Sequence, residues 1–451
     1  MIAKPFTRNC MGEGIRVAGL RLQGAGYRLQ GTAYRLQGTG RMRCRVQAAN
    51  YKESYRSCLF GFWIFQFSGF LWFLSFGSWF FSLFYAVQNV SPTFFQSAWK
   101  RLRKNKGSVF GLCIIALAVL TGLGAYMLAP DHSPNANRMT LEIGGQKPGF
   151  SMLFLKIPKD KVVEKAGIFE RLLNGQEDVY NYIPVRSWRQ VGDSIVVQQY
   201  IDEGIEERQS YYIKDLNADP VSLIVHKTFW LGTDKFGRDI LSRLIVGVRV
   251  SLAVGLIAVV ISLSIGIVLG LVAGYYGGRT DNIIMWFINV VWSMPTLLLV
   301  FAITLALGKG FWQVFIAVGL TLWVNTARII RTQVLSIREL QYIEAARALG
   351  FTNTRIIFRH ILPNVLGPVM VMAASNFASA IVIEAGLSFL GIGVQPPQPS
   401  WGLMIKENYN FIITHNPLLA ISPGICIMLL VLAFNLLGNG LRDALDVRGK
   451  V

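Results

Sequence analysis

Six apolar segments, each long enough to cross a lipid bilayer, constrain the fold more than any other feature. They cover about 108–129, 250–273, 283–307, 312–331, 364–392 and 416–438. Because lipid offers no partner to backbone polar groups, a segment of about 20 residues that crosses it must be helical. Only 15% of the residues are charged, against about 25% in soluble domains. The sequence therefore predicts an all-α polytopic membrane protein with a six-helix bundle, and it excludes a purely soluble enzyme.

Lysine and arginine gather on one side of the predicted spans. Five lie in 100–106, six in 328–359 and three in 442–450, whereas the opposite short loops hold little beyond Lys309 and Lys406. Because basic loops stay inside the cell, this asymmetry predicts a multi-pass protein of the cytoplasmic (inner) membrane, with both ends of the six-span core in the cytoplasm. The net charge of +19 is therefore explained by loop topology, and no nucleic-acid partner is expected.

A long insert, about 131–245, separates the first two spans. Its residues 131–229 hold 12 basic and 14 acidic side chains, so it is nearly neutral. The segments 152–157 and 194–200 have the composition of strands, and 159–174 that of a short helix. We expect an α+β or mostly β extracytoplasmic domain, in which His132 and His226 are ordinary surface residues.

The first 89 residues have an unusual composition. The tetrapeptide RLQG occurs at 21–24, 28–31 and 35–38, and 14 of the 27 residues in 59–85 are Phe, Trp or Tyr. Two interpretations stay open. Either 59–85 is an additional span, or residues 1–89 are translated upstream DNA and the true start lies near Val90. We favour the second, because a regular seven-residue repeat is what a tandem DNA repeat would encode.

The most informative cytoplasmic stretch is 338–364, which reads RELQYIEAARALGFTNTRIIFRHILPN. The pattern predicts two short helices joined at Gly350, because glycine supplies the left-handed turn after a helix. Thr352 or Asn353 can cap the second helix, and Pro363 suits the first turn of the next span. Ala345 and Ala346 are expected to place small side chains on one face. The stretch is thus a docking helix–turn–helix or a mere connector between two spans.

This stretch resembles the EAA loop of ABC importer permeases. Glu344-Ala345-Ala346 precede Gly350 by the family spacing, and RHILPN, with His360 and Pro363, is similar to the variant of the peptide permeases. In that family the loop is a coupling helix that sits in a groove of the ATPase subunit. The resemblance implies an ATPase-coupling role for six residues: Glu344, Ala345, Ala346, Gly350, His360 and Pro363.

Two further stretches, 231–252 and 384–404, resemble the dipeptide/oligopeptide C-type permease subunits. The resemblance covers 90–130 and 228–451 but not 1–89. The insert between the two matching parts is longer than in the common members of the family. It implies a permease domain over 246–451, preceded by a basic segment and first span over 90–130. It also implies four kinds of partner besides the lipid bilayer: a homologous permease, two ATPases, an external substrate-binding protein and a peptide cargo. Nickel or glutathione is the alternative cargo, and a membrane-anchored receptor with a ligand-sensing external domain is the alternative class.

Four charged residues near the predicted outer surface are candidates for the pathway or its outer gate. Asp234, Arg238 and Asp239 can form a cluster, either an ion-pair network that positions the insert or part of a substrate site. Glu384 lies near the outer end of the fifth span, where ionisable residues are often functional. No phosphate-binding loop or hydrolase motif occurs in the sequence. We therefore expect no enzyme activity, cofactor or metal in this chain, and a transport subunit whose ATP hydrolysis takes place on separate ATPases.

Overall fold

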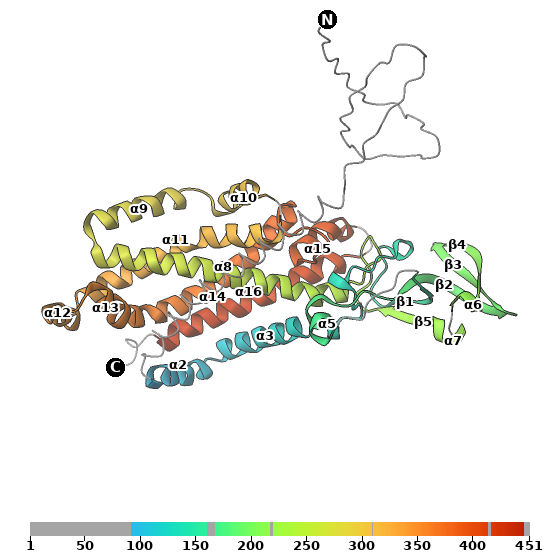
Figure 1. Ribbon diagram of the computed structural model, residues 1–451, viewed down its shortest axis with the longest axis horizontal. Coiled ribbons are helices and arrows are strands. Elements are labelled where there is room, and N and C mark those ends of the chain that lie inside the picture. Colours follow the sequence, from blue (N-terminus) through green and yellow to red (C-terminus); the bar gives the residue numbers. More distant parts are fainter. Residues whose placement is uncertain (1–91, 160–166, 217–219, 309, 414–415, 446–451) are drawn as a thin grey trace, which may run out of the picture. The chain divides into compact units, whose positions relative to one another are not determined.

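The computed structural model describes residues 92–159, 167–216, 220–308, 310–413 and 416–445. Both interpretations of residues 1–89 concern the part of the chain outside these ranges. The described residues form a bundle of long helices and one antiparallel sheet (Figure 1).

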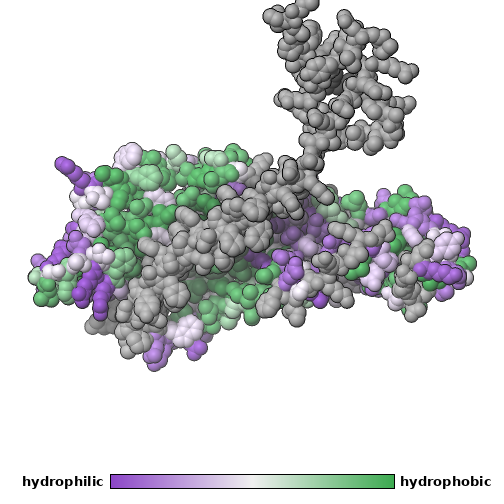
Figure 2. Space-filling view, viewed as in Figure 1, coloured by the Kyte–Doolittle hydropathy of each residue, from purple (hydrophilic) through white to green (hydrophobic). Residues whose placement is uncertain are grey.

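Five helices of the described chain are long and apolar enough to cross a membrane. A sixth span is present if two helices joined by a sharp bend count as one. These elements are α3 (Lys106–Leu123), α8 (Ile240–Tyr276), the pair α9 (Gly278–Trp292) and α10 (Thr296–Leu307), α11 (Phe311–Arg338), α14 (Leu362–Leu390) and α16 (Leu418–Leu445). Figure 2 shows mainly apolar side chains over the flanks of these helices, as lipid contact requires.

The span predicted over 283–307 is interrupted by a sharp bend. Helices α9 and α10 meet at an angle of 92°. Pro295 precedes α10, and the residue before a proline is disfavoured in helical conformation, so the helix stops at Trp292 and restarts beyond the proline.

Two other span boundaries differ from the predicted ones. Helix α8 begins at Ile240, about ten residues earlier than expected, so the insert boundary at 245 falls inside a helix. The first predicted span, 108–129, is divided at Gly124 into α3 and the short α4 (Ala125–Leu128). An amphipathic helix, α2 (Pro92–Lys104), precedes α3.

Helices α8 and α11 pack closely because glycines remove side chains from their contact. A Cβ on Gly266 would lie 2.6 Å from Thr326 Cβ, one on Gly270 2.7 Å from Ala327 O, and one on Gly274 2.7 Å from Val334 Cβ. Small residues on one stripe allow such close approach in lipid. Gly278, the fourth glycine at this spacing, lies beyond the end of α8 and has nothing within 4 Å of such a Cβ.

The sheet occupies the region between α4 and α8. Its strands are β1 (Phe150–Pro158), β2 (Tyr180–Val191), β3 (Ser194–Asp202), β4 (Ile205–Tyr212) and β5 (Ile224–Phe229). They pair antiparallel in the order β4-β3-β2-β1-β5. Leu155, Val185 and Ile195 are fully buried in its core.

The strand predictions for 152–157 and 194–200 are confirmed by β1 and β3. The helix predicted over 159–174 is present as α5 (Ile168–Asn174), and residues 160–166 lie outside the described chain. His132 and His226 are exposed, as expected. Two further one-turn helices, α6 (Ile213–Leu216) and α7 (Pro220–Leu223), lie between β4 and β5.

Candidate functional site

Helices α12 (Gln341–Ala348) and α13 (Asn353–Ile356) form the predicted helix–turn–helix, and Gly350 makes the turn between them. Gly350 has a φ of +76°. Its N–H donates to Arg347 O at 2.9 Å, and the Phe351 N–H donates to Ala346 O at 3.1 Å. These are the two hydrogen bonds of a Schellman motif, which needs a left-handed residue at this position. The local sequence therefore determines the turn.

Thr352, one of the two expected caps, begins α13. Its Oγ1 accepts a hydrogen bond from the Arg355 N–H at 3.4 Å. Asn353 is not the cap. Its Oδ1 instead accepts a hydrogen bond from the Tyr275 hydroxyl of α8 at 2.8 Å. Arg338 at the end of α11 donates to Tyr275 O at 3.2 Å. Asn353 thereby ties the helix–turn–helix to the end of α8, and Arg338 ties the end of α11 to the same tyrosine.

The expectation that Ala345 and Ala346 share one exposed face is wrong. Ala346 is 4% exposed and packs with Ile343 into the core made by α8, α11 and α14. Ala345 is exposed, and so is Glu344. Successive residues of a helix point about 100° apart, so one alanine anchors α12 and the other lies on its free face. That face also presents Leu349, which is 73% exposed.

His360 and Pro363 lie where the helix–turn–helix runs into α14. Pro363 is in the first turn of α14, as predicted, and a π-helical turn, Ile357–Ile361, precedes it. A proline removes one N–H and crowds the preceding turn, and a π turn provides the extra room. The half-buried His360 ring stacks on Phe351, with ring centres 6.1 Å apart. His360 and Pro363 thus support the turn instead of forming its free face.

The predicted charged residues lie at the other end of α8. Its 37 residues span roughly 55 Å at 1.5 Å per residue, and Figure 1 shows α12 at one end of this helix and the sheet beyond the other. Arg238 Nε donates to Asp234 Oδ2 at 2.6 Å, and Arg238 Nη2 donates to Glu407 Oε2 at 2.7 Å. Arg243 Nη2 lies 3.4 Å from the same Glu407 oxygen. The side chains of Arg238 and Arg243 are 2% and 1% exposed, so this is a buried ion network.

Two members of this network, Arg243 and Glu407, were not predicted from the sequence. Glu407 lies in α15 (Trp401–Asn408), within the loop between α14 and α16. Each of these charged residues lies beside an apolar segment, which marks it as unusual, but no local sequence feature predicts that the two form an ion pair. Asp239 stays outside the network: it caps α8, and its Oδ2 accepts from the Ser242 N–H at 2.9 Å.

Glu384 faces the interior of the chain. It is 1% exposed, and Ser388 Oγ donates to its Oε1 at 2.6 Å. The same Ser388 oxygen accepts from the Val394 N–H at 3.0 Å. In this conformation Glu384 stabilises the turn that follows α14, and its role in a pathway stays a prediction.

Two family models match the chain. Residues 266–450 match the binding-protein-dependent transport system inner membrane component. Residues 93–143 match the N-terminal transmembrane domain of oligopeptide transport permease C. The first match contains α12, α13 and Glu384, and the second covers α3, α4 and all of α2 except Pro92.

Three permeases are similar to this chain over about half of its length. The dipeptide transport system permease protein DppC of Alkalihalophilus pseudofirmus is 45% identical over 49% of this chain and 72% of its own. The glutathione transport system permease protein GsiD of Pectobacterium atrosepticum is 42% identical over 54% and 79%. The oligopeptide transport system permease protein OppC of Bacillus subtilis is 41% identical over 51% and 74%.

Proposed function

Since the chain belongs to the family of binding-protein-dependent transport system inner membrane components, we propose that it is a permease subunit of an ATP-driven importer of dipeptides or oligopeptides. The peptide cargo is supported by the similarity to DppC and OppC. The chain would supply half of the pathway, and a second homologous permease would supply the other half.

The free face of α12 is the proposed contact for the ATPase. Glu344, Ala345 and Leu349 form a small, partly apolar surface. Behind it, Ile343 and Ala346 are buried among α8, α11 and α14, so a force on α12 acts on three long helices together. Rocking of packed helices about an interface is a known way to switch a pathway between two sides. This buried attachment is the observation that carries the proposal.

The proposed orientation places α12 and α13 in the cytoplasm and the sheet outside the cytoplasmic membrane. The basic residues between α11 and α14 support this orientation. The sheet and the ion network at the start of α8 would then face the external binding protein, and two ATPases would dock on the other side, one on each permease.

The two alanines of α12 provide a direct test. Ala345→Trp places a bulky ring on the free face, so the full chain should insert into the membrane but fail to co-purify its ATPase. Glu344→Lys should act in the same way, whereas Glu339→Lys, at an exposed position just before α12, is the matched control. ATPase capture that is unchanged by both Ala345→Trp and Glu344→Lys would remove α12 from the contact.

Glutathione is the second candidate cargo, because the GsiD permease is about as similar as the peptide permeases. Uptake of a labelled dipeptide by cells with the complete transporter, in competition with unlabelled glutathione or oligopeptide, separates these cargoes. A receptor function predicts a stable chain that captures neither a permease nor an ATPase.

A further inference from the structure

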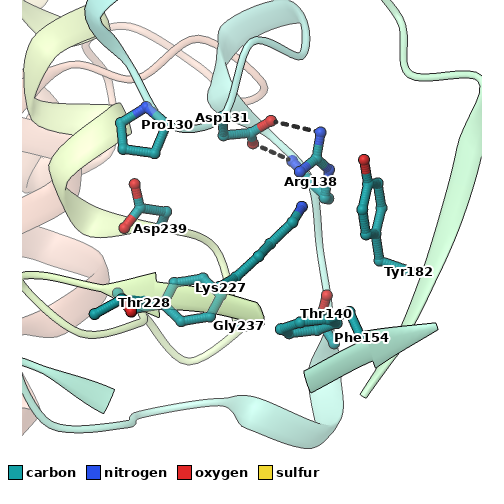
Figure 3. A pocket seen from close by; sticks show the side chains of 11 residues that line it. Pro130, Asp131, Arg138, Thr140, Phe154, Tyr182, Lys227, Thr228, Gly237 and Asp239 are labelled. Carbon is teal, nitrogen blue, oxygen red and sulfur yellow. Dashed lines mark hydrogen bonds and ion pairs between the residues drawn. The ribbon is translucent and has the colours of Figure 1, made fainter. Parts of the chain in front are cut away.

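A cavity of about 200 Å³ lies between the sheet and the start of α8. Figure 3 shows Lys227 of β5 extending into it between the strands on one side and Asp131 and Asp239 on the other. Of the candidate coupling and pathway residues, Asp239 alone is among the residues that line this cavity. The cavity thus combines cationic, anionic and aromatic side chains in a volume below the roughly 300–1,000 Å³ of drug-sized ligand sites.

Lys227 brings to this cavity an amine that forms no ion pair within 4.0 Å among the described residues. Its Nζ lies 3.4 Å from the centre of the Tyr182 ring and 5.8 Å from that of Phe154. Among the residues that the structure describes, no carboxylate lies within 4.0 Å of Nζ, and Nζ makes no hydrogen bond. Arg138, the neighbouring cation, is already paired with Asp131 at 3.3 Å and Asp178 at 2.5 Å. Of these two basic side chains, Lys227 is therefore the one without an ion pair in the described chain.

Asp239 brings a carboxylate oxygen that is poorly satisfied by the described chain. Its Oδ2 accepts from the N–H and the hydroxyl of Ser242, whereas its buried Oδ1 accepts no hydrogen bond of good geometry from the described residues, although the Leu241 N–H also acts on this carboxylate. Leaving a buried acceptor unsatisfied is unfavourable, and a native structure usually has a reason for it. The ion pairs of the described chain do not include one between Lys227 and Asp239, so these groups do not satisfy one another.

We propose that this cavity binds a small zwitterion, a free amino acid or a short peptide. The ligand carboxylate would accept from the Lys227 ammonium, and the ligand ammonium would donate to Asp239 Oδ1. The rings of Phe154 and Tyr182 would contact its apolar part. That the zwitterion is a peptide rests on the proposed function. That the ligand carries both charges rests only on Lys227 and Asp239.

Titration calorimetry of the full chain in lipid nanodiscs, with L-alanyl-L-alanine as the probe, tests the site. We expect binding that weakens at least about tenfold when the ammonium is acetylated or the carboxylate is amidated, as loss of a charge-assisted hydrogen bond implies. Lys227→Met should weaken it to the same degree. Asp239→Asn should also weaken it, while asparagine still caps α8. Lys235→Met, at an exposed lysine outside the cavity, is the control and should bind normally.

Three results would overturn the proposal. These are no binding of the dipeptide, binding that Lys227→Met leaves unchanged, and equal binding of the acetylated dipeptide, which would make the site a plain anion site. If Lys227→Met does not elute as a folded protein, the two capped dipeptides decide the matter on the unaltered chain. The calorimetry uses the chain without an ATPase or a binding protein, so it does not depend on transport. If the complete transporter fails to import peptide but the chain still binds the dipeptide through Lys227, only the proposed function is refuted.

Discussion

Arg238 and Glu407 are 169 residues apart in the sequence, yet Arg238 Nη2 lies 2.7 Å from Glu407 Oε2 in a site from which solvent is nearly excluded. The pair connects α15, which contains Glu407, with the segment just before α8, which contains Arg238. Arg238 also donates to Asn137 Oδ1 at 3.1 Å, so one guanidinium connects three parts of the chain. This arrangement agrees with a positioning role for the charged cluster.

Glu407→Ala should destabilise the chain strongly. Removing one partner of a buried ion pair leaves the other charge uncompensated, which typically costs about 3–5 kcal/mol. Thermal unfolding of the detergent-purified chain measures the effect. Glu206→Ala is the matched control, because Glu206 pairs with Arg186, which is 63% exposed, and exposed pairs contribute about 0–1 kcal/mol. Equal shifts for both variants would show that the network adds no more than a surface pair.

Gly350→Asp should abolish peptide import while leaving membrane insertion intact. Nothing lies within 4 Å of a Cβ added at this position, but its φ of +76° strains any residue that carries a side chain. Aspartate adds a negative charge at the C-terminal end of α12, where the helix dipole disfavours it, and on the proposed contact surface. Gly350→Asn is the control, since asparagine tolerates left-handed backbone. Import at a normal rate by the aspartate variant would refute the coupling role.

Gly270→Ala should lower the thermal stability of the purified chain. The added Cβ would lie 2.7 Å from Ala327 O and 2.8 Å from Ile330 Cβ, so α8 and α11 would have to separate. Overpacking of this kind costs about 1–3 kcal/mol. Gly424→Ala in α16 has nothing within 4 Å of the new atom and should cause no loss. A Gly270→Ala melting temperature equal to that of Gly424→Ala would argue against a close contact there.

The stability of the unliganded chain should rise between pH 7 and pH 10.5 because of Lys227. Burial, with Arg138 and more weakly Lys156 adding to it, lowers the pKa of Lys227 from 10.5 to about 7, against the opposing effect of Asp178 and Asp131. In this window the unfolded chain binds the proton that the folded chain has released, so raising the pH favours the folded state.

The slope from this single group is at most about 1.4 kcal/mol per pH unit. Melting curves of the unaltered chain and of Lys227→Met at pH 7.5 and 9.5 measure it. The methionine variant should be the more stable at the lower pH, and the difference should shrink at the higher pH. A difference that stays constant would mean that Lys227 keeps an ordinary pKa.

Much of the fold follows from local sequence signals. The apolar segments predict the helices because a span in lipid must satisfy its own backbone. Gly350 and Thr352 predict the turn after α12 because both act on backbone groups within a few residues. The bend between α9 and α10 belongs here too, since Pro295 was a local signal that the length of the apolar segment obscured.

The candidate sites depended on contacts that no local signal contains. Ala345 and Ala346 are equivalent in composition, and only the packing of α12 on α8, α11 and α14 decides which of them is free. The charges of Arg238 and Glu407 were visible in the sequence, but their pairing required α15 to fold back against the start of α8.

Local sequence signals were sufficient to predict the membrane spans, the turn near Gly350 and the family resemblance. The folded chain was needed to show that Ala346 is buried under α12, that Glu407 completes the ion network, and that Lys227 and Asp239 line one cavity. Backbone hydrogen bonding and hydropathy act over a few residues, whereas burial and charge pairing depend on residues that meet only after folding.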